Sequence, residues 1–112
     1  AIANASFDDG GIAVSICEGQ NQDAQVINAQ VADELLNIKG IRASFVAGVN
    51  DKGITCISAR SLGDINVQVL LEKIGGGGHL NTAGAQVKEK PEEVLEIVLG
   101  LLEKGEKNES NT

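Results

Sequence analysis

The sequence predicts a single α/β domain with a mixed central β-sheet of about four to five strands and about three helices. Three observations support this prediction. The chain has 112 residues, a length typical of one domain. Runs with strand periodicity alternate with runs of helical periodicity along the chain. The first strand-like run, residues 12–17, is apolar on both faces, as in a strand buried within a sheet.

The first two elements are a strand and a helix. We predict the strand at Ile12–Cys17, and a helix over Asp23–Ile38, where apolar residues recur at helical spacing. Asn21 or Asp23 can cap the start of this helix, and Gly40 can supply the left-handed residue that ends it. The predicted buried face of the helix consists of Ala24, Ile27, Val31, Leu35 and Ile38.

A β-hairpin follows. Residues Ile41–Val49 return to a period of two, with apolar side chains on one side. The segment Asn50–Gly53 has the composition of a tight hairpin turn, and Ile54–Arg60 is the second strand. We therefore expect two antiparallel strands here.

A shorter helix and the last strand come next. The spacing of Val67, Leu70, Leu71 and Ile74 predicts a helix that begins near Asp64 or Ile65. This helix is expected to stop at Gly75. After a glycine-rich loop, the alternation in Ala83–Val87 predicts the final strand.

The third helix opens at Pro91, because proline suits the first helical turn and the acidic residues after it favour a helix N-terminus. It is predicted to run through about Leu102. The polar residues from Gly105 onward are expected to fray. We assign residues 1–104 to the domain and residues 105–112 to a polar, disordered tail.

Composition excludes several classes of protein. Hydrophobic residues make up 42% of the chain, and none of the apolar runs approaches the roughly 20 residues that cross a bilayer. Phe7 and Phe45 are the two aromatic residues, so stacking of bases on aromatic rings is excluded as the main mode of binding. The net charge of -7 has the wrong sign for a broad nucleic-acid surface, and any nucleotide must be bound locally.

The residues of a complete catalytic centre are missing from the sequence. Cys17 and Cys56 lie inside apolar runs and are expected to be reduced, buried thiols. There is one histidine, and the Asp8–Asp9 pair has none near it, so no metal-ligand spacing is present. The chain begins at Ala1 and contains no methionine, from which we expect a domain excised from a larger protein.

Four consecutive glycines, Gly75–Gly78, precede His79 and are the unusual feature of the sequence. Such a run costs conformational entropy, and it allows backbone N–H groups to approach phosphate oxygens while His79 adds a ring donor. The alternative is a flexible turn between a helix and a strand. No lysine followed by serine or threonine comes after the run, so it is not a Walker A loop, and it lies at the anion-repelling end of its helix.

A second candidate segment runs from Arg60 and Ser61 to Asn66, at the end of a strand and the start of a helix. The Arg60 guanidinium can bind a phosphate with two donors. The alternative is that Arg60 is a solvated strand end and that Ser61 or Asp64 caps the helix. A helix of about nine residues separates the two candidate segments by roughly 14 Å. Either the glycine loop folds back, or the two segments hold different parts of one extended ligand.

These motifs resemble a known family. The segments Ser58–Ser61, Asn66–Val67 and Gly75–His79, followed by Ala83–Gly84, resemble the DHH-associated domain, the C-terminal partner of DHH phosphoesterases. The resemblance covers nearly the whole chain. The four-glycine form with Ala-Arg-Ser upstream is most similar to the GdpP/YybT group of membrane-tethered cyclic-di-AMP phosphodiesterases.

The resemblance implies half of an active site. A DHH domain of the same parent chain would carry Asp and His ligands for manganese, and this chain would hold no metal and no catalytic residue. The chain would grip cyclic-di-AMP, a short linear dinucleotide or a short oligonucleotide. The implied substrate-binding residues are Arg60, Ser61, Asn66, Gly75, Gly76, Gly77, Gly78 and His79.

The resemblance also sets expectations about the parent protein. The parent would be a cytoplasmic hydrolase tethered to the cell membrane, whereas this domain would not touch the membrane, would be inactive alone and could form a homodimer. Nano-RNA hydrolases and RecJ-type nucleases share the glycine loop, so an associated domain of such a nuclease is an alternative. A non-catalytic nucleotide-sensing module and an assembly domain are further alternatives.

Overall fold

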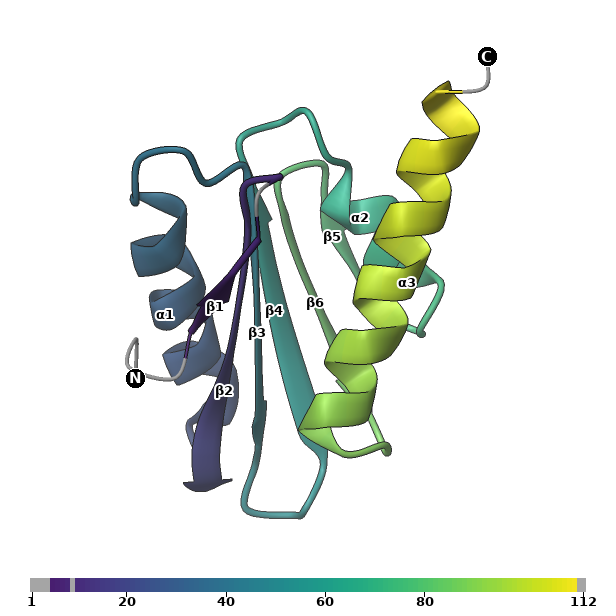
Figure 1. Ribbon diagram of the computed structural model, residues 1–112. Helices are drawn as coiled ribbons and strands as arrows, with labels where there is room; N and C mark the ends of the chain where they lie inside the picture. Colours follow the sequence, from purple (N-terminus) through teal and green to yellow (C-terminus); the bar gives the residue numbers. More distant parts are fainter. Residues whose placement is uncertain (1–4, 9, 111–112) are drawn as a thin grey trace.

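The computed structural model describes residues 5–8 and 10–110, and within these ranges the chain forms six strands and three helices (Figure 1). In chain order they are β1 (Ser6–Phe7), β2 (Ile12–Gln20), α1 (Ala24–Leu36), β3 (Ala43–Val49), β4 (Thr55–Ser61), α2 (Val67–Glu72), β5 (Gly77–His79), β6 (Thr82–Val87) and α3 (Pro91–Ser110).

The strands form one mixed sheet in the order β1-β2-β3-β4-β6-β5. The β2–β3 pair is parallel, and the other four pairs are antiparallel. The predicted α/β class is confirmed, and the six strands slightly exceed the expected four to five; the strands that the sequence did not locate are the short edge strands β1 and β5. Two or three residues are too few to show an alternating pattern, and glycine is depleted in strands, so sequence periodicity does not reveal them.

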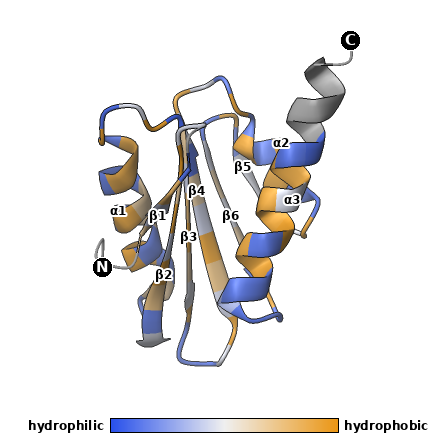
Figure 2. Cartoon of the chain, viewed as in Figure 1, coloured by the Kyte–Doolittle hydropathy of each residue, from blue (hydrophilic) through white to orange (hydrophobic). Residues whose placement is uncertain are grey.

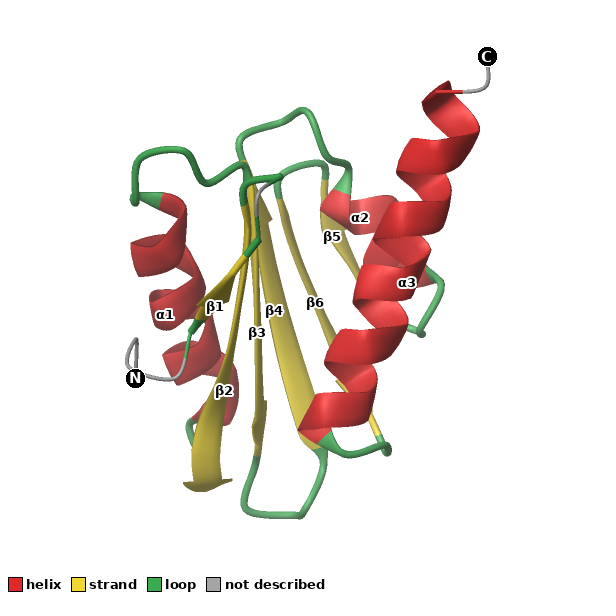
Figure 3. Ribbon diagram, in the orientation of Figure 1, coloured by secondary structure: helices red, strands yellow, loops and turns green. Residues whose placement is uncertain are grey.

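Helices cover the two faces of the sheet unequally. Helix α1 packs on β3 and β4 on one face, whereas α2 and α3 lie on the other (Figures 1 and 3). The larger core lies on the α2 and α3 side and surrounds Phe45, which is completely buried. A smaller core lies under α1 and includes Val31, Leu35 and Val46. Hydrophobic and hydrophilic bands alternate along α3, as expected for a helix with one face on the sheet (Figure 2).

The first helix agrees with the prediction except at its ends. Ala24, Val31 and Leu35 are buried as expected, but Ile38 is exposed because α1 ends at Leu36. The Ile38 N–H instead bonds the carbonyl of Leu35 in a final turn, and Gly40 adopts the predicted positive φ of 91°. Of the two predicted caps, Asp23 occupies the N-cap position but its side chain makes no capping bond, whereas Asn21 stabilises the preceding turn, its Oδ1 accepting from the N–H of Asp23 at 2.9 Å.

The predicted hairpin between β3 and β4 is confirmed. Asn50 organises the turn, because its Oδ1 accepts from the N–H groups of Lys52 and Ile54 at 2.9 and 3.0 Å. Gly53 has a φ of 80°, which few other residues tolerate. These contacts are local, which explains why four residues of sequence were enough to predict the turn.

The boundaries of the second and third helices also differ from the prediction. Helix α2 starts after Asn66, not near Asp64 or Ile65, because the Asn66 side chain caps it. Asp64 instead pairs with Arg42 at 2.7 Å.

Helix α3 continues to Ser110, so residues 105–110 are helical rather than a disordered tail. The helix continues because lysine and glutamate have good helix propensity and the single glycine in this segment does not end it. Residues 111–112 of the predicted tail lie outside the described residues. Across the described residues, none of the helices has the length and apolar character of a membrane span.

Candidate ligand-binding face

The sequence predicts a loop for the glycine run. In the structure the second half of the run instead folds back and forms the edge strand β5. Gly75, with a φ of 91°, ends α2, and Gly77–His79 then pairs with β6 in antiparallel orientation. The reason is steric: a Cβ on Gly76 would lie 2.3 Å from the Gly84 carbonyl oxygen, and one on Gly78 would lie 2.3 Å from the Thr82 carbonyl oxygen. Only residues without a Cβ allow this close approach to β6.

The fold-back brings Arg60, the first residue of one predicted segment, into line with His79, the last residue of the other. Arg60 of β4 pairs with Thr82 of β6, and Thr82 pairs with His79 of β5. Side chains of directly paired residues lie on the same face of a sheet, so these three form one row. The Cα atoms of Arg60 and His79 are two strand spacings apart, roughly 10 Å. Of the two alternatives left open by the sequence, the fold-back of the glycine segment is the one observed.

This row begins at Arg60, beside α1, and continues onto the outward side of β6 and β5, where none of the described helices packs; we call these residues the open face: Arg60, Thr82, Gly84, Gly77 and His79. Thr82 and His79 are exposed. Gly84 and Gly77 pair with each other beside the row and leave a strip of bare backbone. The same strands bury Ala83 and Ala85 on the opposite side, against α2. The open face therefore combines three polar side chains with a surface that a ligand can approach closely.

The glycines of the run have different structural roles. Gly76 and Gly78 are required by the close approach of β5 to β6, and Gly75 by its backbone angle. A Cβ on Gly77, by contrast, meets nothing within 4 Å, and Gly77 is not among the glycines with positive φ. The protein fold therefore gives no reason for glycine at position 77.

Two predicted site residues lie away from the open face. Ser61 is buried, and its Oγ accepts from the N–H of Gly63 at 2.9 Å. Asn66 caps α2, with its Oδ1 accepting from the N–H of Val69 at 3.2 Å. Both side chains have local structural partners, which is the alternative that the sequence left open for this segment, although the cap is Asn66 rather than Ser61 or Asp64.

Two residues that the sequence did not single out lie on or beside the open face. Thr82 lies between Arg60 and His79, and the alternation of Ala83, Ala85 and Val87 was the signal that placed Thr82 outward. Asp33 of α1 pairs with Arg60, its Oδ1 accepting from Nε at 2.8 Å. Twenty-seven residues separate this pair, and no local pattern indicates it.

The thiols and acidic side chains do not add a metal centre. Cys17 and Cys56 are free, and burial raises the pKa of both above the ordinary value of 9.0. Within the described parts of the chain, no three His, Cys, Asp or Glu side chains come together in a group that could hold a metal ion. The resemblance places manganese on a DHH domain of the parent and not on this chain.

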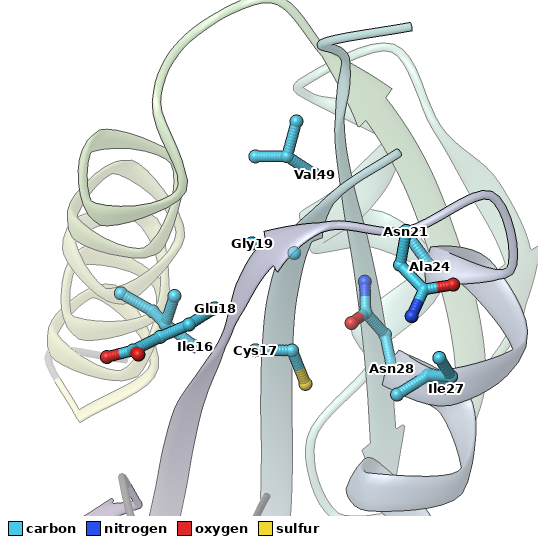
Figure 4. Close-up of a pocket in the computed structure, with 10 residues that line it drawn as sticks. Ile16, Cys17, Glu18, Gly19, Asn21, Ala24, Ile27, Asn28 and Val49 are labelled. Atoms are coloured by element: carbon cyan, nitrogen blue, oxygen red, sulfur yellow. The ribbon is translucent and has the colours of Figure 1, made fainter. Parts of the chain in front are cut away.

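A pocket of about 280 Å³ lies elsewhere, between the end of β2 and the start of α1 (Figure 4). Asn28 in its wall is fully buried and donates from Nδ2 to the carbonyl of Cys56 at 2.9 Å. Its Oδ1 occupies the space that a Cβ on Gly48 would need, 2.8 Å away. None of the predicted site residues lines this pocket, and Asn28 ties α1 to the sheet.

Fold and site together define a small α/β domain that presents a glycine-histidine hairpin at one edge of its sheet. The chain belongs to the DHHA1 domain family, whose model matches residues 9–104. This finding confirms the resemblance drawn from the motifs.

Curated relatives share this domain. The chain is 48% identical over 88 residues to the cyclic-di-AMP phosphodiesterase GdpP of Geobacillus thermodenitrificans, covering 79% of this chain and 13% of the relative. It is 47% identical over 79 residues to the cyclic-di-AMP phosphodiesterase PdeA of Listeria monocytogenes, covering 70% of this chain and 12% of the relative. The chain thus spans a small part of the length of these proteins.

Solved structures share the fold. An exopolyphosphatase-related protein from Bacteroides fragilis superposes with a TM-score of 0.75 at 24% identity, covering 92% of this chain and 32% of that one. A pGpG-specific phosphodiesterase from Vibrio cholerae gives a TM-score of 0.57 at 15% identity, covering 92% and 36%. At these identities the likeness concerns the fold alone.

Proposed function

We propose that this chain is the substrate-binding half of a DHH phosphodiesterase and that its open face holds cyclic-di-AMP or a short linear dinucleotide. The single observation that carries the proposal is the row of Arg60, Thr82 and His79 beside the bare strip of Gly77 and Gly84. Similarity to GdpP and PdeA supports a cyclic dinucleotide as the substrate class.

The chemistry of the row suits a phosphodiester. A guanidinium donates several N–H groups in a plane, an imidazole donates from its ring, and a threonine hydroxyl donates one further bond. The glycine strip lets the ligand reach backbone groups without meeting side chains. The acidic balance of the chain favours a small ligand bound at one place over a long strand held by many phosphate contacts.

Binding and orientation are the tasks that we assign to this chain. Hydrolysis requires an activated water and stabilisation of charge on the phosphorus oxygens, and manganese held by a DHH domain of the parent would supply this chemistry. In this arrangement the row orients the scissile bond toward the DHH domain of the same parent chain. We further propose that the parent is tethered to the membrane and that this domain lies in the cytoplasm.

Turnover of cyclic-di-AMP with manganese tests the proposal, using the full-length protein that contains this chain and, in parallel, the chain alone. We expect product from the full-length protein and none above blank from the chain alone. Turnover by the chain alone would overturn the assignment of binding without chemistry. Tight binding without turnover by the full-length protein would instead support a nucleotide-sensing module, and preferential cleavage of longer RNA would support a nuclease.

A pair of variants on β6 checks the location of the site. Thr82→Val keeps the β-branched shape and removes the hydroxyl, whereas Gln86→Ala changes an exposed residue on the same face, four residues further along the strand. We expect weaker cyclic-di-AMP binding for Thr82→Val and unchanged binding for Gln86→Ala. The reverse order would move the ligand away from the row.

A further inference from the structure

The guanidinium of Arg60 is held in a defined position before any ligand arrives. Its Nε donates to Oδ1 of Asp33 at 2.8 Å, and its Nη1 donates to the carbonyl of Ala59 at 2.9 Å. The Arg60 side chain is 15% exposed, whereas that of Asp33 is 62% exposed. Among the described residues, Nη2 has no hydrogen-bond partner. Two of the three nitrogen atoms are therefore anchored, and the third keeps its donors for a ligand.

The anchoring carboxylate comes from a helix that is itself fixed beside Arg60. The carbonyl of Ala32, the residue before Asp33, accepts from Oγ of Ser44 at 2.7 Å. Ser44 on β3 is the direct cross-strand partner of Arg60 on β4. This buried bond sets the position of α1 at the level of the row, so Asp33 lies at the border between the helix-covered part of the sheet and the open face.

A carboxylate beside a phosphate site has two opposing effects. Its charge repels an anionic ligand, a weak effect for an exposed group in water. Its hydrogen bond restricts a long side chain to one conformation, which raises the fraction of molecules that are ready to bind. The two effects predict opposite results when Asp33 is removed, so the structure allows them to be separated by experiment.

We infer that Asp33 is a positioning residue for the substrate: through its bond to Nε it holds in place the guanidinium of Arg60, whose backbone is in register with Thr82 and His79. This inference rests on the proposed function, because it requires that Arg60 binds a phosphate of cyclic-di-AMP. Asp33 does not touch the ligand, and its effect is transmitted through Arg60.

Three variants of the full-length protein test the inference, with cyclic-di-AMP as the substrate. Asp33→Ala removes both the charge and the hydrogen bond, and we expect KM to rise about tenfold with kcat within about twofold of wild type. Asp33→Asn keeps the acceptor oxygen and should restore most of the wild-type KM. Glu34→Ala is the matched control, because it removes a neighbouring exposed carboxylate from α1 without touching Arg60, and it should leave KM unchanged.

The remaining outcomes decide against the inference in different ways. Lower KM values in both Asp33 variants would show that charge repulsion dominates, and unchanged KM in Asp33→Ala would show that the pair does not position Arg60.

A second readout does not depend on the proposed function. The Nε–H NMR signal of Arg60 should be protected from solvent exchange in wild type, and this protection should be lost in Asp33→Ala. If the wild-type protein neither binds nor turns over cyclic-di-AMP, the proposed function fails, whereas protection of Nε–H still reports on the pair.

Discussion

The two faces of the β5–β6 hairpin differ in what they require of the same residue type. On the face toward α2, Gly76 and Gly78 allow the two backbones to approach, and a Cβ at either position would collide with β6. On the other face, Gly77 has open space in front of it. Glycine is needed on one face for packing within the protein, whereas on the other no contact among the described residues requires it. A run of glycines in the sequence does not show which of them the packing requires, but the strand register does, because it assigns each position to one face of the sheet.

The largest expected effect is that of Gly77→Val in the full-length protein. The backbone at this position accepts an ordinary residue, and valine suits a strand, so the domain should stay folded. The side chain would occupy the bare strip and block close approach to the backbone, so we expect a loss of more than about 100-fold in kcat/KM for cyclic-di-AMP. Thermal melting of the same preparation is the control. A large fall in melting temperature with unchanged affinity would show that Gly77 is structural.

His79→Ala tests the row itself. Loss of one positioned donor should lower kcat/KM for cyclic-di-AMP by about 100-fold, and His79→Gln should recover part of this loss because an amide restores a donor without the charge. His79 is exposed, so neither change should lower the melting temperature greatly. Wild-type efficiency in a folded His79→Ala protein would remove His79 from the site.

Gly76→Ala tests the packed face. The added methyl group would lie 2.5 Å from the Cβ of Ala85, so β5 must shift or the core must yield, at a cost of about 1–3 kcal/mol in the free energy of unfolding. Chemical denaturation of this chain measures that cost. Gly77→Ala adds the same methyl group to the open face and should be nearly neutral by comparison. Equal destabilisation by the two substitutions would contradict the division of the hairpin into a packed and an open face.

The smallest effect concerns the thiols. Burial raises the pKa of Cys17 and Cys56 in the folded state, so their protonated forms contribute stability that is fully present below pH 9.0 and is lost as the pH rises through the raised values. The free energy of unfolding should therefore decrease above pH 9, and a variant with Cys17→Ala and Cys56→Ala should show a shallower decrease. An identical slope in wild type and variant would show that the thiols are not responsible.

The sequence predicts elements whose determinants are local. The Asn50 turn is defined by bonds within five residues, and α1 by an apolar face that recurs at helical spacing. The candidate site is different, because the row of Arg60 and His79 depends on two strand pairings that bring distant segments together. Residue types alone point to both end members of the row. The alternation along β6 indicates that Thr82 faces outward but not that it lies between them, and no local pattern indicates Asp33.

Two of the predicted site residues, Ser61 and Asn66, have local structural roles in the described structure. Both lie where a strand leads into a helix, and both use their side chains to satisfy nearby backbone N–H groups. Such local bonds are a frequent use of serine and asparagine at the ends of elements. A polar residue at a helix start is therefore weak evidence for a ligand, whereas an arginine within a strand whose partners are small residues is stronger.

The pairing of His79 with Thr82 also makes the site sensitive to the length of the connection from α2. Successive residues of a strand point to opposite sides, so inserting or deleting one residue between Gly75 and Gly77 would turn the imidazole through half a revolution, from the solvent side to the α2 side. A change of two residues would preserve the side but displace the ring along the strand by roughly 7 Å. Binding at this edge is therefore expected to depend on the number of residues between α2 and His79 as well as on their types. Adding or removing an odd number of glycines is expected to abolish binding.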